Sequence, residues 1–137
     1  MKQRGVSLME LLVVVVIVGI LAAIAIPGYQ QYAMRTHRTD AKVALTSRAA
    51  ALERCFTRYT AYNSANCTAA TSLPETVESG RYEIRIANLT ATTFQLRAVP
   101  LGAQTGDDQC AILTLDQANQ RDVTGKYAAT PERCWKR

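Results

Sequence analysis

The chain opens with a long run of apolar positions. No side chain between residues 11 and 26 is polar, and no residue between Glu10 and Arg35 is charged. About 20 apolar residues are enough to cross the hydrocarbon core of a bilayer. We therefore predict a membrane-spanning or assembly helix here, with Glu10 as a lone carboxylate at its edge.

An amphipathic pattern follows this run. In residues 36–59 the apolar positions recur three or four residues apart, which places them on one face of a helix. They are Leu45, Ala49, Leu52, Phe56 and Tyr59. Because no glycine or proline occurs from residue 29 to residue 62, we predict one continuous helix from about residue 7 to residue 59, with a kink at Pro27.

The period of the pattern changes to two after residue 80. The segments RYEIRIA and TFQLRAV alternate polar and apolar residues, which predicts two half-buried strands joined by a hairpin at residues 88–92. A third strand is predicted in CAILTL and a short fourth at residues 121–124. Residues 60–80 are rich in Thr, Ser, Asn and Ala and predict an irregular connection.

These elements predict an α+β fold. A sheet with one apolar face needs a cover, and the apolar stripe of the helix provides it. We expect the long N-terminal helix, half apolar and half amphipathic, to pack on an antiparallel sheet of three or four strands.

The cysteines indicate an oxidising compartment. They are Cys55, Cys67, Cys110 and Cys134. No C-x-x-C pair is present and the single histidine is distant in sequence, which disfavours zinc. Two disulfides fit better and place this part of the chain outside the cytoplasm. Among three connectivities we favour Cys55–Cys67 with Cys110–Cys134, since each bond closes a local loop; four reduced, buried cysteines are the alternative.

Cationic residues follow the apolar run. Arg35, Arg38 and Lys42 form a stripe along the predicted helix, which can meet anionic lipid headgroups or DNA phosphates. A solvated helix face is the commoner explanation, and no interleaved aromatic residues support base stacking. DNA is therefore kept only as the less favoured partner. The net charge of +5 includes Lys2 and Arg4, which precede the apolar run, so it says little about a nucleic-acid partner.

The sequence offers no catalytic site. Neither G-x-S-x-G nor a phosphate-binding glycine loop is present, and His37 is predicted to be a solvated residue on the helix surface. Asp107 and Asp108 lack the repeated acidic pattern of a calcium loop and predict a polar turn. We predict no enzyme, no metal and no cofactor.

Residues 4–32, RGVSLMELLVVVVIVGILAAIAIPGYQQY, resemble the N-terminus of type IV pilins. Members have a short basic leader ending in glycine, a glutamate five residues after the cleavage site, an apolar helix and a proline near its end. The resemblance implies cleavage between Gly5 and Val6 by a prepilin peptidase, followed by N-methylation of Val6. Val6 departs from the phenylalanine or methionine that most pilins carry at this position.

The resemblance implies a partner for Glu10. Cleavage creates an α-ammonium group on Val6, and in pilin-like fibres the glutamate pairs with this cation on a neighbouring subunit. An unpaired carboxylate in an apolar fibre core is costly, so the pairing sets the subunit register; a water-exposed Glu10 is the alternative. Gly19 and Pro27 match positions between which pilin helices lose hydrogen bonds inside the fibre.

The expected organisation is a prepilin leader at residues 1–5, a transmembrane and assembly helix at residues 6–33, and a head domain at residues 34–137. Three later segments, HRTDAKVALTSRAAALER, CAILTLDQANQR and ERCWKR, are similar to minor pilins of the PilE type. Cys110 and Cys134 match the pair that brackets the C-terminal region of that family.

The resemblance implies a structural subunit of a type IV pilus that supports pilus biogenesis, twitching motility and adhesion. It would reside in the inner membrane, with its head in the periplasm, before extraction into the extracellular fibre. Its partners would be other pilins, the peptidase and the assembly platform. The alternatives are a major pilin, a DNA-binding competence pilin, a type II secretion pseudopilin, and a small domain secreted after an ordinary signal peptide.

Overall fold

The computed structural model describes residues 6–136. The chain divides into two compact units between Ala33 and Met34, and each is described separately. The predicted long helix is confirmed as α1, Leu8–Tyr59, which begins and ends within a residue of the predicted limits. The predicted leader residue Gly5 lies outside the described residues.

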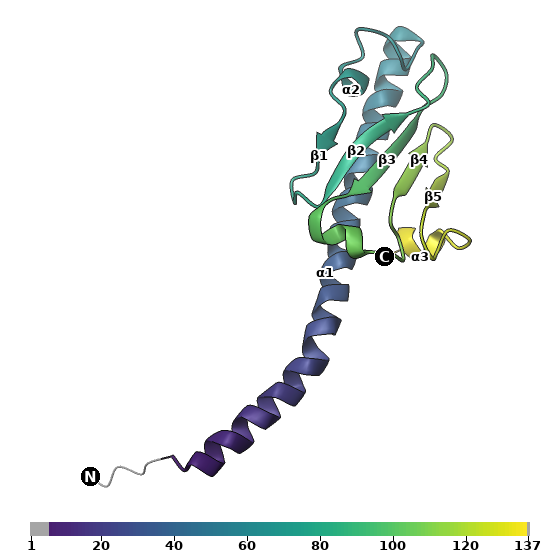
Figure 1. The fold of residues 1–137 in the computed structure, drawn as a ribbon. Helices are drawn as coiled ribbons and strands as arrows, with labels where there is room; N and C mark the ends of the chain where they lie inside the picture. The colour runs from purple at the N-terminus through teal and green to yellow at the C-terminus, as the bar shows by residue number, and fades with distance from the viewer. Residues whose placement is uncertain (1–5, 137) are drawn as a thin grey trace. The chain divides into compact units, whose positions relative to one another are not determined.

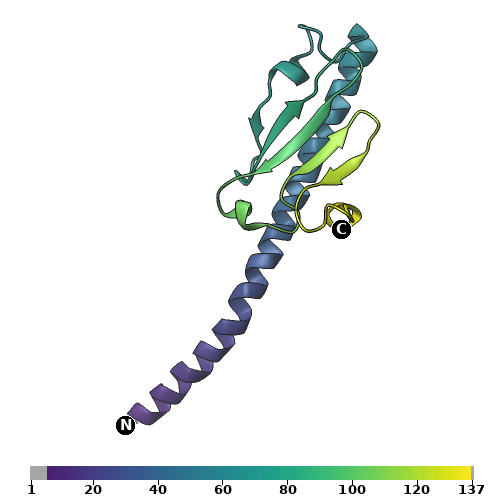
Figure 2. The same cartoon turned by 45° about the vertical axis from the view of Figure 1, so that its right-hand side comes forward.

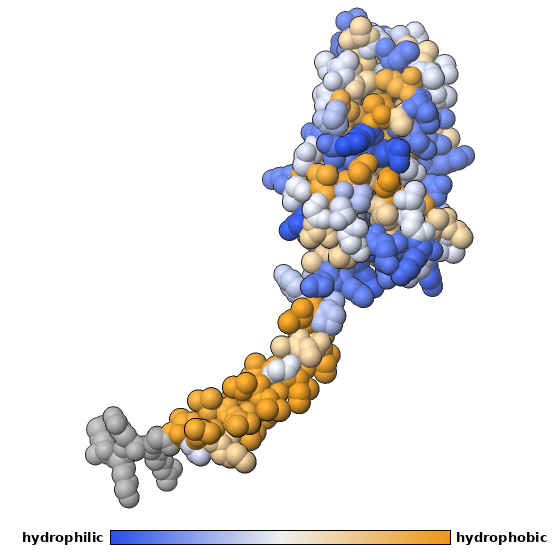
Figure 3. All heavy atoms as spheres, in the orientation of Figure 1, coloured by the Kyte–Doolittle hydropathy of each residue, from blue (hydrophilic) through white to orange (hydrophobic). Residues whose placement is uncertain are grey.

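The first unit consists of the apolar part of α1. Its large apolar side chains are exposed in the single chain; Leu8, for example, is 82% exposed. By length and composition, α1 is apolar enough to cross a membrane, and Figure 3 shows the apolar surface of this stretch. Gly19 and Pro27 both lie within α1, so any loss of helical hydrogen bonds between them in a fibre stays a prediction.

The second unit, which we call the head unit, comprises residues 34–137. After α1 come the short helix α2 (Thr68–Thr71) and the strands β1 (Glu75–Thr76), β2 (Tyr82–Ala87) and β3 (Gln95–Pro100). They are followed by the 3-10 helix η1 (Gly102–Gly106), strands β4 (Leu113–Asp116) and β5 (Arg121–Val123), and helix α3 (Glu132–Trp135). Figures 1 and 2 show the sheet lying on one side of the C-terminal part of α1.

The sheet has five strands in the order β1-β2-β3-β4-β5, and all neighbours are antiparallel. The prediction of three or four strands is therefore wrong. The strand that it omits is β1, which lies inside the predicted irregular connection. β1 has only two residues, both exposed, so it carries no alternating pattern that sequence reading can detect. Its place depends on pairing with β2, where Glu75 is opposite Ile84.

The core of the head unit lies between α1 and the sheet. Leu45 and Leu52 of the predicted helical stripe are fully buried. The inward side chains of the sheet include Ile84 and Leu96, at 1% and 0% exposure. Helical periodicity of 3.6 and strand periodicity of two thus converge on one apolar layer, and this layer positions the polar network described below.

Candidate functional site

Val6 and Glu10, the two residues that the resemblance to pilins implicates in assembly, lie at the start of the first unit. Val6 is 72% exposed, and Glu10 is in the first turn of α1, where a negative charge complements the helix dipole. Glu10 is exposed, and the structure records no ion-pair partner for it among residues 6–136. The proposed partner belongs to a neighbouring subunit, so that pairing stays a prediction.

Arg38 occupies a different environment from the one predicted. It is only 8% exposed, and its guanidinium contacts Asp107 through Nε at 2.5 Å and a terminal nitrogen at 2.6 Å. The assignment of Arg38 to an exposed cationic stripe is therefore wrong. Its spacing from Ala41 and Leu45 places it on the buried face of α1, and the Asp107 carboxylate compensates its charge in this environment.

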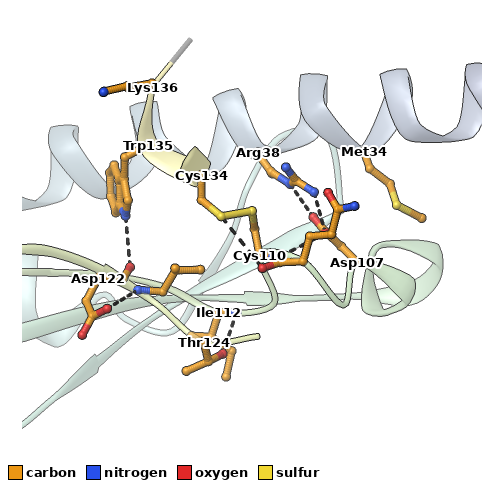
Figure 4. Close-up of a disulfide and its surroundings, with 12 residues drawn as sticks. Met34, Arg38, Asp107, Cys110, Ile112, Asp122, Thr124, Cys134, Trp135 and Lys136 are labelled. Carbon is orange, nitrogen blue, oxygen red and sulfur yellow. Dashed lines mark hydrogen bonds and ion pairs between the residues drawn. A yellow bond between two sulfur atoms is a disulfide. The ribbon is translucent and has the colours of Figure 1, made fainter. Parts of the chain in front are cut away.

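Asp107 is a buried structural residue that the sequence did not reveal. It is 2% exposed and also accepts hydrogen bonds from the Gln104 side chain at 3.2 Å and the Cys110 backbone N–H at 3.2 Å. Figure 4 shows Asp107 and Cys110 beside Arg38 of α1. The predicted polar turn holds only for Asp108, which is exposed and forms an ion pair with Lys126. A hydrogen bond from Lys126, together with its positive charge, lowers the pKa of the Asp108 carboxyl.

Gln104 extends the network to the sheet. Its side-chain nitrogen donates to the hydroxyl of Tyr82 at 3.0 Å and to the backbone carbonyl of Met34 at 3.3 Å. Both Gln104 and Tyr82 are buried. The network therefore links α1, β2 and the η1 loop, and it fixes the loop that leads to Cys110.

Burial raises the pKa of the Tyr82 hydroxyl to about 12. Because this pKa exceeds the unfolded value of 10.0, the free energy of unfolding keeps its full value below pH 10 and falls as the pH rises from 10 to 12. We expect a loss of about 2 kcal/mol in the free energy of unfolding attributable to this hydroxyl. Urea denaturation at pH 9 and pH 12 should show a smaller pH dependence for Tyr82→Phe than for the unmodified chain.

The structure contains two disulfides, Cys55–Cys67 and Cys110–Cys134. The first joins the end of α1 to the loop before α2. The second joins the loop after Asp107 to α3, with Cα atoms 5.9 Å apart. All four cysteines are thereby removed from thiolate chemistry, and the C-terminal region is held beside α1.

Close packing also fixes the loop that precedes α3. Gly125 has φ +108°, and a Cβ at this position would lie 2.6 Å from the carbonyl oxygen of Asp108. Only glycine fits this conformation without displacing backbone. The Trp135 indole N–H donates to the Asp122 carbonyl at 3.0 Å, which anchors α3 against β5, as Figure 4 shows.

The other two residues of the predicted cationic stripe stay near the surface. Arg35 is exposed and Lys42 is half-buried. The part of the chain that the structure describes holds no group of three His, Cys, Asp or Glu side chains arranged for a metal ion. What the described residues provide is an exposed apolar helix, a disulfide-bounded head and basic surfaces.

Comparison with known proteins adds family information. Residues 27–114 match the family model described as "Type IV minor pilin ComP, DNA uptake sequence receptor", and residues 1–26 match the prokaryotic N-terminal methylation motif. The type IV major pilin protein PilE1 of Neisseria gonorrhoeae is 31% identical over 96 residues, covering 69% of this chain and 58% of that protein. A fimbrial protein of Pseudomonas aeruginosa is 62% identical over 39 residues, which are 28% of this chain and 25% of that protein.

The alignment with PilE1 thus spans little more than half of that relative's length. Among solved structures, the non-core minor pilin PilV of Neisseria meningitidis matches 69% of this chain and 90% of its own, with a TM-score of 0.56 and 16% sequence identity. At this identity the likeness concerns the fold alone.

Proposed function

Because the chain belongs to the type IV pilin family, we propose that it is a minor structural subunit of a type IV pilus. The observation that carries this proposal is the exposed apolar half of α1. A helix that is apolar on all sides has to be buried in lipid or among other helices. In the proposed cycle it is buried first in the inner membrane and then among neighbouring pilins, while the head faces the periplasm and later the fibre surface.

The proposed maturation begins with cleavage after Gly5 by a prepilin peptidase. N-methylation of Val6 follows, which keeps the new terminus cationic, and the assembly platform extracts the subunit. Glu10 would pair with the terminus of an adjacent subunit and set the register. The minor class is supported by the family model, whose description names a minor pilin, whereas the PilE1 relative is named a major pilin.

The fibre fraction of the native cells tests this proposal. We expect surface fibres sheared from these cells to contain the chain, and cells that lack it to show reduced piliation or twitching. Quantification of the chain relative to the main fibre subunit distinguishes a minor from a major pilin. Its absence from purified fibres that contain other pilins would contradict the proposal.

A second candidate function is DNA capture by the assembled pilin. The family model describes a DNA uptake sequence receptor, which favours a search for a basic face. Arg85 on β2 lies directly opposite Arg97 on β3, and like charges at such positions destabilise a sheet. Glu83 forms an ion pair with Arg85. Figure 3 shows a strongly hydrophilic patch over the middle of the head unit.

The salt dependence of DNA binding tests this candidate. For the full chain in neutral detergent, we expect the log–log slope of duplex affinity against salt to fall in magnitude by about 2 in Arg85→Gln/Arg97→Gln, because two phosphate contacts are lost. Arg54→Gln/Arg58→Gln removes the same charge from an exposed part of α1 and serves as the control. Equal slopes in the two double variants would contradict capture by this face.

A further inference from the structure

A basic groove opens on the head unit between the N-terminal part of its helix and the C-terminal region. Its volume is about 640 Å³, within the range of small-ligand sites. The side chains that matter for its chemistry are those of Arg35, Lys42, Tyr127, Arg133 and Lys136. They come from segments about 90 residues apart in sequence, so only the fold brings them together.

The groove is held in shape by contacts on both sides. The Cys110–Cys134 disulfide fixes the helix α3 that carries Arg133. The Arg133 guanidinium lies over the Tyr127 ring, 4.9 Å from its centroid. Lys42 Nζ donates to the backbone carbonyl of Lys136 at 3.3 Å, which ties α1 to the C-terminal segment. An anion would meet these cations already assembled, at a lower entropic cost.

The charge of the groove is strongly one-sided. None of its lining residues within the described chain is acidic. Arg38 also borders the groove, but its charge is matched by the buried Asp107. The nearby Asp108 carboxylate forms an ion pair with Lys126. The groove therefore fits a phosphate-bearing ligand held by Lys and Arg side chains.

The place of the groove along the chain favours a lipid. The uncharged run that follows Glu10 ends at Met34, and the first groove cation, Arg35, comes directly after it. When the apolar run spans a bilayer, Arg35 falls at the depth of the headgroups, where basic residues bind anionic phospholipids. We propose that the groove binds the phosphate of an anionic phospholipid headgroup while the subunit is anchored before assembly. This inference rests on the membrane stage of the proposed function.

Native mass spectrometry of the full chain in neutral detergent tests this proposal, with phosphatidylglycerol and phosphatidylcholine as probes. The unmodified chain should bind phosphatidylglycerol more tightly than phosphatidylcholine. Because each basic residue contributes about fivefold in affinity, Arg133→Gln/Lys136→Gln should weaken phosphatidylglycerol binding roughly 25-fold. Arg54→Gln/Arg58→Gln, which removes the same charge elsewhere, should retain the affinity of the unmodified chain.

A further variant distinguishes lost binding from misfolding of the C-terminal region. Arg35→Gln changes only an exposed helix residue and should weaken phosphatidylglycerol binding about fivefold. Unchanged phosphatidylglycerol affinity in both groove variants would overturn the proposal. If inorganic phosphate competed as effectively as phosphatidylglycerol itself, the groove would be a site for free phosphate. If duplex DNA competed more tightly than phosphatidylglycerol, it would be a nucleic-acid site. Either result would overturn the lipid assignment. Fibre incorporation is a separate measurement, so failure here leaves the proposed pilin role standing.

Discussion

Replacement of Asp107 with asparagine is expected to lower the free energy of unfolding of the head unit by about 3–5 kcal/mol. The substitution preserves the shape of the side chain but leaves the buried Arg38 guanidinium without its counter-charge. A buried charge without a partner is strongly destabilising, even where the intact pair adds little net stability. The fluorescence of Trp135, the single tryptophan, provides a readout for urea denaturation.

Two comparisons separate this explanation from a general loss of charge. Asp108→Asn changes the adjacent carboxylate, whose pair with Lys126 is exposed, and should leave the urea midpoint nearly unchanged. The double variant Arg38→Met/Asp107→Asn removes both charges, keeps a carbonyl acceptor for the Gln104 and Cys110 donors, and should recover most of the loss. A midpoint for Asp107→Asn equal to that of Asp108→Asn would contradict the proposed role of the buried pair.

Replacement of Glu10 with glutamine is expected to reduce incorporation into fibres by tenfold or more. An ion pair between Glu10 and the terminus of a neighbouring subunit would be lost, and a buried cation would remain without its partner, which costs several kcal/mol. A difference of 1.4 kcal/mol already corresponds to about tenfold in an equilibrium. Quantitative immunoblots of sheared fibres, normalised to the chain in the membrane fraction, measure the effect.

Glu78→Gln is the matched control for this variant. It removes one carboxylate from the exposed surface of the head unit and should leave fibre incorporation at the unmodified level. Normal incorporation of Glu10→Gln would show that Glu10 does not set the subunit register. Its loss from the membrane fraction as well as from fibres would instead indicate a failure before assembly.

The main layers of the fold were predictable because their patterns are local. The helical stripe containing Leu45 and Leu52 and the alternating residues of β2 and β3 repeat within single elements, so each predicts its own buried face. β1 gave no such signal, since its two residues are both exposed. It becomes a strand only because the folded chain supplies β2 as its neighbour.

The Arg38–Asp107 pair was beyond sequence reading for a related reason. The two residues are 69 positions apart, and each resembles an ordinary surface residue in its local context. The spacing of Arg38 from Ala41 and Leu45 was the one available signal, because it continues the apolar face by another turn. Charge alone led to the opposite assignment, an exposed stripe with Arg35 and Lys42.

The central claim, that the chain is a processed pilin subunit, is tested most directly by its intact mass in sheared fibres of the native cells, measured with and without reductant. We expect a chain that lacks residues 1–5, carries one added methyl group and gains four protons on reduction of its two disulfides. A chain that begins near Gly28 and is found only in the medium would contradict the claim, because it would have lost Glu10 and the apolar helix on which assembly depends.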